Sequence, residues 1–152
     1  DTSKTAVNYL PRYGLNFAFL DPFNIGALDF RIFDNLSERK RMDIIVHLSK
    51  MDLQRNLGRN ISSAASSFDQ FAPGWRNAIT LGQGQKAIRS AILEHWKGLI
   101  AKCGFEASPE MRLLKGTKEQ HLYWLLLIAS HQLAHRFWAT ASNTDGQGKL
   151  PF

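Results

Sequence analysis

The residues most able to do chemistry lie where two apolar runs end. The first run, Asn16 to Leu20, is followed by Asp21, Pro22, Phe23 and Asn24. A short apolar run that ends at an acid and a proline predicts a buried strand whose carboxyl end delivers Asp21 into a crevice. The alternative is purely structural: the strand stops at Pro22, and Asp21 is an ordinary acidic turn residue.

The second run, Met42 to Leu48, is β-branched and apolar and carries His47 at its carboxyl end. Strand ends in open α/β sheets point at the ligand crevice, so His47, Ser49 and Asp52 could line the same cleft as Asp21. The alternative is a partly buried histidine whose hydrogen bonds are satisfied within the fold. The two runs together predict one candidate site at the end of a parallel strand pair.

These runs belong to a larger set of blocks spread over about residues 16 to 140. In sequence order they are Asp21 to Asn24, Gly26 to Phe30, Arg41 to Ser49, Met51 to Leu57, Phe68 to Phe71, Gly74 to Arg76, and Leu122 to Ser130 with His131 and Arg136 to Trp138. As a set they resemble the three-Cys-motif partner proteins, a bacterial family. The fold of that family is similar to that of the S-adenosylmethionine-dependent methyltransferases.

The resemblance implies a role for the first strand end. In many amino-group methyltransferases a strand ends in an acid or amide, prolines and an aromatic, so that oxygens hold the target nitrogen while the ring stacks on it. Asp21, Pro22 and Phe23 would then orient a methyl acceptor by proximity and hydrogen bonding, with His47 beside them. This chain has one proline at that place where the family pattern has a pair.

The resemblance also implies that part of the protein lies upstream. Family members begin with a strand, a glycine-rich turn and a helix that would hold the cofactor, and nothing before Asn16 has this pattern. We therefore expect the carboxyl-terminal half of a longer protein, with S-adenosylmethionine bound by the full-length protein only. The isolated chain is expected to bind no cofactor and to be inactive.

Three functions remain open at this point. The first is a methyltransferase when full length, and the second is a non-catalytic interaction partner of a three-cysteine-motif protein. The third is a basic accessory that contacts nucleic acid, which 19 Lys and Arg against 13 Asp and Glu permit. Trp75, beside Arg76, is the one candidate for an exposed stacking platform. The cluster Arg39 to Arg41 is expected to be solvated surface.

The periodicity predicts an α/β fold with a carboxyl-terminal antiparallel hairpin. The resemblance implies that this is the second half of a Rossmann-like, methyltransferase-like sheet. One domain over residues 1–142 and a polar tail over 143–152 are expected. The strands 16–20, 42–48, 121–129 and 110–114 should lie side by side in that order, the third antiparallel to the first two. Strand 16–20 would leave an open edge for self-association, for a missing segment, or for the first fifteen residues to cover. The expected helices are 27–39, 50–57 capped by Ser49, a short one within 74–80, 85–102 and 131–141, with a loop that has no packed face at 61–68.

The remaining motifs are weaker. Gly82-Gln-Gly84 fits a dinucleotide fingerprint but lacks a strand before it, which favours a loop leading into a helix. His131 and His135 share a helix face, yet no third ligand is identifiable, so capping or packing is favoured and no metal site is predicted. Cys103 is the only cysteine, reads as a packing residue and excludes an internal disulfide, which fits a reducing cytoplasm. No run is long enough to cross a membrane.

Overall fold

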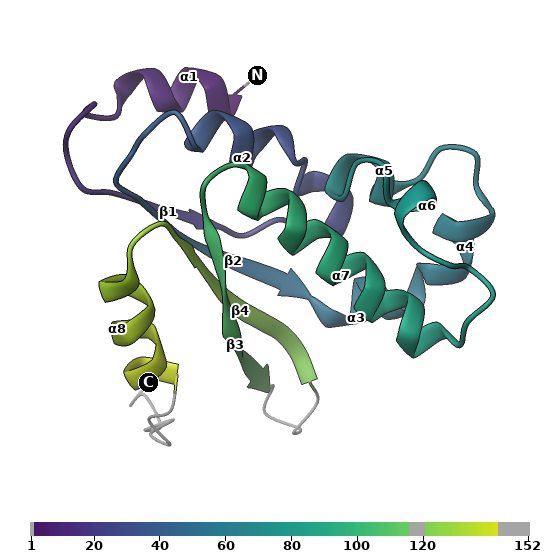
Figure 1. The fold of residues 1–152 in the computed structure, drawn as a ribbon. Helices are drawn as coiled ribbons and strands as arrows, with labels where there is room; N and C mark the ends of the chain where they lie inside the picture. Colours follow the sequence, from purple (N-terminus) through teal and green to yellow (C-terminus); the bar gives the residue numbers. More distant parts are fainter. Residues whose placement is uncertain (1, 116–120, 143–152) are drawn as a thin grey trace.

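The computed structural model describes residues 2–115 and 121–142, and a four-stranded mixed sheet forms its centre (Figure 1). The strand order is β1 (Asn16–Leu20), β2 (Met42–Ser49), β4 (His121–Ala129) and β3 (Glu106–Lys115). β1 and β2 are parallel, and β4 is antiparallel to both of its neighbours. The predicted strand order and directions are therefore confirmed.

Alternation along β2 determines which face of the sheet forms the core. Met42, Ile44, Val46 and Leu48 are fully buried, while the residues between them are only partly buried. Successive side chains of a strand point to opposite faces, so one face of β2 is entirely apolar and the other carries Asp43, Ile45, His47 and Ser49. The side chain of His47 therefore lies on the face opposite the main core.

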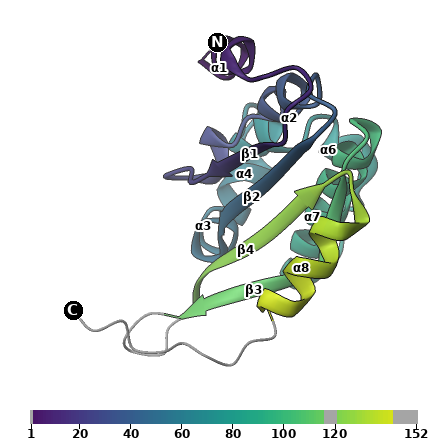
Figure 2. The ribbon, with the colours of Figure 1, turned by 90° about the vertical axis from the view of Figure 1, so that its left-hand side faces the viewer.

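The helices divide unequally between the two faces (Figure 2). The long helix α7 buries Ile88, Ile92, Trp96 and Ile100 in the core that covers one face. Across the sheet, α8 contacts β3 and β4, and the guanidinium of Arg112 donates to the carbonyl of Ala141 at 2.8 Å. The helices are α1 (Thr2–Tyr9), the 3-10 helix η1 (Ile25–Ala27), α2 (Arg31–Leu36), α3 (Lys50–Arg55), α4 (Leu57–Ser62), α5 (Ser67–Phe71), α6 (Trp75–Ala78), α7 (Gln85–Lys102) and α8 (Gln132–Ser142).

Helix boundaries were predicted well where a cap marks them. The hydroxyl of Ser49 accepts from the N–H of Asp52 at 3.1 Å and caps α3. Gly104, at φ 83°, follows the carboxyl end of α7, where a left-handed residue lets a helix terminate. The predicted range of α7 is confirmed, and α6 lies within the short helix expected at 74–80.

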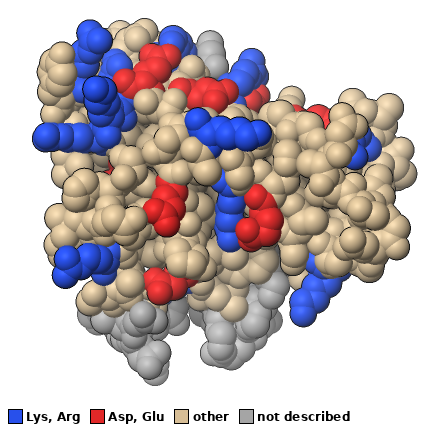
Figure 3. Space-filling view, in the orientation of Figure 1, with Lys and Arg blue, Asp and Glu red and all other residues tan. Residues whose placement is uncertain are grey.

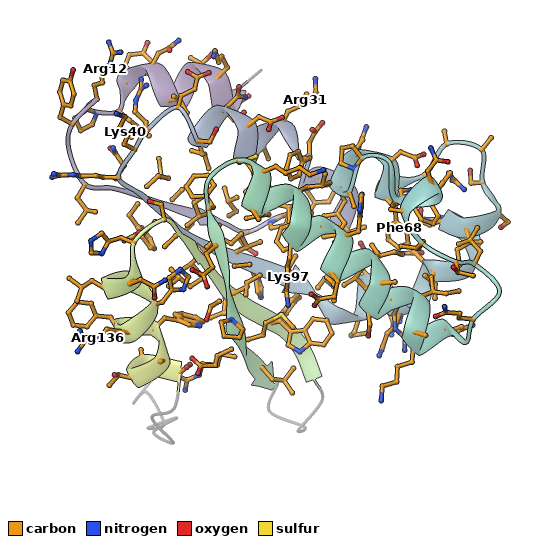
Figure 4. The ribbon with its side chains drawn as sticks, in the orientation of Figure 1. Arg12, Arg31, Lys40, Phe68, Lys97 and Arg136 are labelled. Atoms are coloured by element: carbon orange, nitrogen blue, oxygen red, sulfur yellow. The ribbon has the colours of Figure 1, made fainter. Side chains whose placement is uncertain are left out.

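Two predictions in the first half of the chain are wrong in detail. Residues 27–39 form no continuous helix, because the Asn24 side chain accepts from Ala27 N at 2.9 Å and closes η1 as a separate turn. The expected loop at 61–68 does have a packed face: α4 extends to Ser62, and Phe68 is fully buried in α5 (Figure 4).

Other segments were missed or fall outside the described residues. α1 was not predicted, and it packs on α2, where Val7 is fully buried. β3 begins at Glu106, earlier than expected, with a register shift between Ala107 and Met111. The predicted tail at 143–152 and most of the link between β3 and β4 lie outside the described residues. Within residues 2–115 and 121–142, no helix is long and apolar enough to cross a membrane.

Candidate functional site

The structure brings Asp21 and His47 into direct contact. Asp21 follows β1, and His47 lies near the end of β2; the parallel register pairs Leu20 with Val46. Parallel strands end at the same edge of a sheet, so the two side chains lie beside each other, with Nδ1 of His47 2.5 Å from Oδ1 of Asp21. The structure thus brings these two residues together at one end of the sheet.

The contact fixes which nitrogen of the imidazole carries a proton. A carboxylate oxygen only accepts, so His47 Nδ1 donates to Asp21 Oδ1. The Nε2 atom of His47 is buried and has no hydrogen-bond partner among the described residues. The side chain of His47 is 16% exposed, whereas that of Asp21 is 61% exposed. The carboxylate of Asp21 is therefore the accessible group of the pair. The hydrogen bond from the imidazole of His47 fixes its position.

Tyr123 of β4 packs against the ring of His47. Its ring centroid lies 4.0 Å from that of His47, with the two planes tilted by 44°. The antiparallel register of β2 with β4 pairs Ser49 with Tyr123, and His47 with Leu125. The two rings thus come from neighbouring register positions, and Tyr123 limits the rotation of the imidazole that positions Asp21.

Ser49 and Asp52 were predicted to line the same cleft, and the structure gives both side chains a structural role instead. The hydroxyl of Ser49 is the cap of α3. Asp52 Oδ2 accepts from the backbone N–H of Ile25 at 2.6 Å, and Oδ1 accepts from the amide of Asn56. The Asp52 carboxylate therefore joins α3 to η1, with one internal hydrogen bond to each oxygen.

Phe23, two residues after Asp21, presents an exposed aromatic ring. Its side chain is 90% exposed, although large apolar side chains normally lose most of their exposure in a fold. Pro22 is partly buried, and Asn24 is used as the cap of η1. In the loop after β1, Asp21 and Phe23 are thus exposed to solvent, while Pro22 and Asn24 contact the rest of the fold. An exposed carboxylate with an exposed ring two residues on can bind a nitrogen-bearing planar or cationic group.

The histidine pair on α8 serves capping and packing, as the sequence favoured. His131 Nδ1 accepts from Leu133 N at 3.1 Å, and His135 Nε2 donates to the carbonyl of Ala129 at 3.2 Å. Burial raises the pKa of the nearby Asp43, and the charges of His135 and His131 oppose that rise. In the part of the chain that the structure describes, no cluster of three or more His, Cys, Asp or Glu side chains could hold a metal ion.

Cys103 is a packing residue, as predicted. Burial, and then its contact with Asp34 Oδ1 at 3.3 Å, raise the pKa of its thiol to about 11. A nucleophilic cysteine needs a lowered pKa, so this environment disfavours thiolate chemistry at neutral pH. Gly84 precedes α7 as its N-cap residue, after a turn rather than a strand, which agrees with the loop interpretation of the glycine pair.

Trp75 was the one candidate for an exposed stacking platform, and the structure rules it out. The side chain is fully buried, its indole N–H donates to Asp69 Oδ1 at 2.7 Å, and the guanidinium of Arg76 covers the ring at 4.4 Å from the centroid. Arg76 is itself fixed by three backbone carbonyls, those of Asn60, Ile61 and Ser63. A base cannot stack on a ring enclosed in this way.

The charged surface is mixed rather than uniformly basic. Figure 3 shows Lys and Arg side chains gathered over the region of α1 and α2, with acidic side chains among them. The cluster Arg39 to Arg41 was expected to be solvated surface. Lys40 and Arg41 are exposed, but the guanidinium of Arg39 donates to the carbonyl of Val7 at 2.7 Å.

Sequence reasoning missed Tyr123. It lies in the block Leu122 to Ser130, which the resemblance includes, but no local pattern sets the register of β4 against β2. The antiparallel placement of β4 was predicted, and that placement alone puts several β4 side chains near His47. Only the observed register selects Tyr123 among them.

Comparison of the chain with protein-family models, with curated proteins and with solved structures gave no significant match. What is established is an α/β fold with a four-stranded mixed sheet in which β1 and β2 are parallel.

Proposed function

We propose that the carboxyl ends of β1 and β2 bind a nitrogen-bearing acceptor group in a methyltransferase-like protein of the three-Cys-motif partner type. The observation that carries the proposal is the Asp21–His47 contact, with Phe23 exposed two residues after Asp21. One carboxylate oxygen is held by the imidazole, and the Asp21 side chain remains largely accessible. Phe23 supplies a face on which an acceptor can stack.

The roles of the residues follow from their exposure. Asp21 accepts a hydrogen bond from the acceptor nitrogen, and Phe23 fixes the plane of the acceptor group. His47 acts as a positioning residue, because its free nitrogen is buried away from any ligand. The chemistry is therefore orientation of the reacting nitrogen rather than proton transfer. S-adenosylmethionine would supply the methyl group from the upstream half that the resemblance implies.

The decisive experiment uses a form of the protein extended upstream to include the cofactor half. Methyl transfer from labelled S-adenosylmethionine is measured on protein, RNA and small-molecule fractions of a cell extract. Asp21→Ala should lower transfer by about 100-fold or more, since a misplaced acceptor loses the benefit of orientation. Glu94→Ala, a surface substitution on α7, is the matched control. Unchanged transfer by a folded Asp21→Ala protein would return Asp21 to a structural role.

The positioning role of His47 has its own test in the same assay. Asparagine can place an amide N–H near the position of Nδ1, so His47→Asn should retain more transfer than His47→Ala. The loss in both variants should fall on kcat more than on KM for S-adenosylmethionine. Equal losses in the two variants would mean that the hydrogen bond to Asp21 does not matter.

The location of the cofactor site is tested on the present chain alone. Calorimetric titration with S-adenosylmethionine should give no binding in the micromolar range. Micromolar binding would contradict an upstream cofactor site.

A second function, as a non-catalytic interaction module, is favoured by one observation. Phe17 and Phe19 of β1 are 60% and 56% exposed on the sheet face that α7 does not cover. A protein that shows no methyl transfer in its extended form, with Asp21 and His47 intact, would favour this function over the first.

A further inference from the structure

β1 is an edge strand that carries none of the usual protection against pairing. Within the described residues its only strand neighbour is β2. Natural edge strands usually carry a lysine, a proline or a bulge, and Asn16 to Leu20 has none of these. The preceding residues do not provide a covering strand, because α1 packs on α2 instead. β1 therefore presents an apolar, unpaired edge.

The backbone groups that face this edge can be identified. The N–H of Asn16 donates to the carbonyl of Arg41 at 2.8 Å, so Asn16 points its backbone toward β2. Successive residues of a strand point their backbone groups to opposite sides, so Ala18 and Leu20 also face β2. Phe17 and Phe19 then point their N–H and C=O groups outward, in the position that a further strand would bond.

We propose that two copies of this chain pair antiparallel through β1, about a two-fold axis at Ala18. In this register Phe17 of one copy lies opposite Phe19 of the other, and each pair exchanges two backbone hydrogen bonds. The four rings gather on the same face of a continuous eight-stranded sheet. Ala18 meets its own copy on the axis, where opposite residues approach most closely and a small side chain fits.

The charges at the two ends of β1 support the antiparallel direction. The exposed side chains of Arg12, Lys40 and Arg41 lie near its beginning, where Figure 4 shows Arg12 and Lys40 on adjacent segments. Asp21 follows its end. An antiparallel pair sets the basic end of each copy against the acidic end of the other, whereas a parallel pair would set like charges together.

The exposed apolar area sets the expected strength. Leu15, Phe17 and Phe19 are 77%, 60% and 56% exposed. Together these three side chains can bury on the order of 400 Å² per copy. The total lies near the lower limit for specific interfaces, so a micromolar dimer is expected rather than a permanent one.

Analytical ultracentrifugation from low micromolar to several hundred micromolar protein tests the proposal. The chain should show a monomer–dimer equilibrium, and Phe19→Lys should raise its dissociation constant at least about tenfold. Leu81→Lys is the control, since Leu81 is also exposed, at 41%, and lies in the turn before α7. A chain that stays monomeric, or a folded Phe19→Lys protein that dimerises like the parent, would overturn the proposal.

A cross-link tests the register without weakening the edge. In a Cys103→Ser background, Ala18→Cys should form a disulfide-linked dimer under mild oxidation, because the two residues face each other on the axis. Phe17→Cys in the same background should not, since its opposite residue is Phe19. Cross-linking of Phe17→Cys but not of Ala18→Cys would refute the proposed register.

Discussion

Replacing Asp69 should destabilise the fold more than any exposed acid, because its carboxylate joins three segments. Asp69 Oδ2 accepts from Ser66 N at 2.7 Å in a capping box, and Oδ1 accepts from the buried indole of Trp75. An unpaired buried donor costs about 1–3 kcal/mol, and a lost helix cap costs about 1 kcal/mol. Asp69→Ala should therefore lower the free energy of unfolding by about 2–4 kcal/mol.

Asp69→Asn separates hydrogen bonding from charge. The amide keeps one accepting oxygen, so it can serve either Ser66 or Trp75 but not both, and a loss of about 1–2 kcal/mol is expected. Urea unfolding at neutral pH gives these values, and Glu94→Ala, in an exposed pair with Lys97, should cost no more than about 0.5 kcal/mol. An Asp69→Ala protein with the parent's midpoint and slope would refute the reasoning.

The pH dependence of the free energy of unfolding gives an independent check on the hydrogen bonds of Asp69. Burial alone would raise the pKa of Asp69, but the N–H of Ser66, the indole of Trp75 and the charge of Arg76 together hold this pKa below its usual value. A lowered folded-state pKa means that the stabilisation is complete above the unfolded pKa of about 4 and is lost as the pH falls through the folded value. The stability difference between the parent and Asp69→Asn should shrink below pH ~4. A difference that grows on acidification would contradict this assignment.

Two further predictions concern the titratable groups Cys103 and Asp43. Because the pKa of Cys103 is raised to about 11, iodoacetamide should alkylate the folded protein at least about 100-fold more slowly than free cysteine at pH ~8. Alkylation at the rate of the free amino acid would show that the thiol is not buried. Burial raises the pKa of Asp43 against the opposing charges of His135 and His131, so the ionised carboxylate destabilises the fold. Asp43→Asn should therefore raise Tm at neutral pH. This gain in Tm should disappear as the pH falls through the raised pKa of Asp43. A lower Tm for Asp43→Asn at neutral pH would mean that attraction to the histidines outweighs burial.

The elements with strong periodicity and clear caps were predictable. β1 and α7 have the predicted boundaries, because an apolar run between polar turns and an apolar stripe ended by Gly104 are local signals. The sequence also placed Asp21 and His47 near the same end of two parallel strands, and the structure brings them into contact. Local pattern and sheet topology agree in this part of the chain.

The predictions that failed concern side chains whose hydrogen-bond and packing partners no local sequence pattern identifies. Trp75 stands between a glycine and an arginine, a context that suggests exposure, yet Asp69 satisfies its indole and Arg76 covers its ring. The two carboxylate oxygens of Asp52 likewise accept hydrogen bonds from Asn56 and from the backbone of Ile25 in η1. A sequence shows that a side chain can accept a hydrogen bond, but not which donor the fold brings to it.

The antiparallel pairing of β2 with β4 also determines when the fold can form. These central strands are separated along the chain by α3 to α7 and by β3, so their contact closes a long loop. Loop closure costs entropy before the contact returns any stability. During synthesis, β1, β2 and the helices up to α7 would emerge with β2 as an open edge until Ala129 leaves the ribosome. The centre of the sheet is therefore completed late, and a chain interrupted before β4 leaves the backbone edge of β2 open to its surroundings.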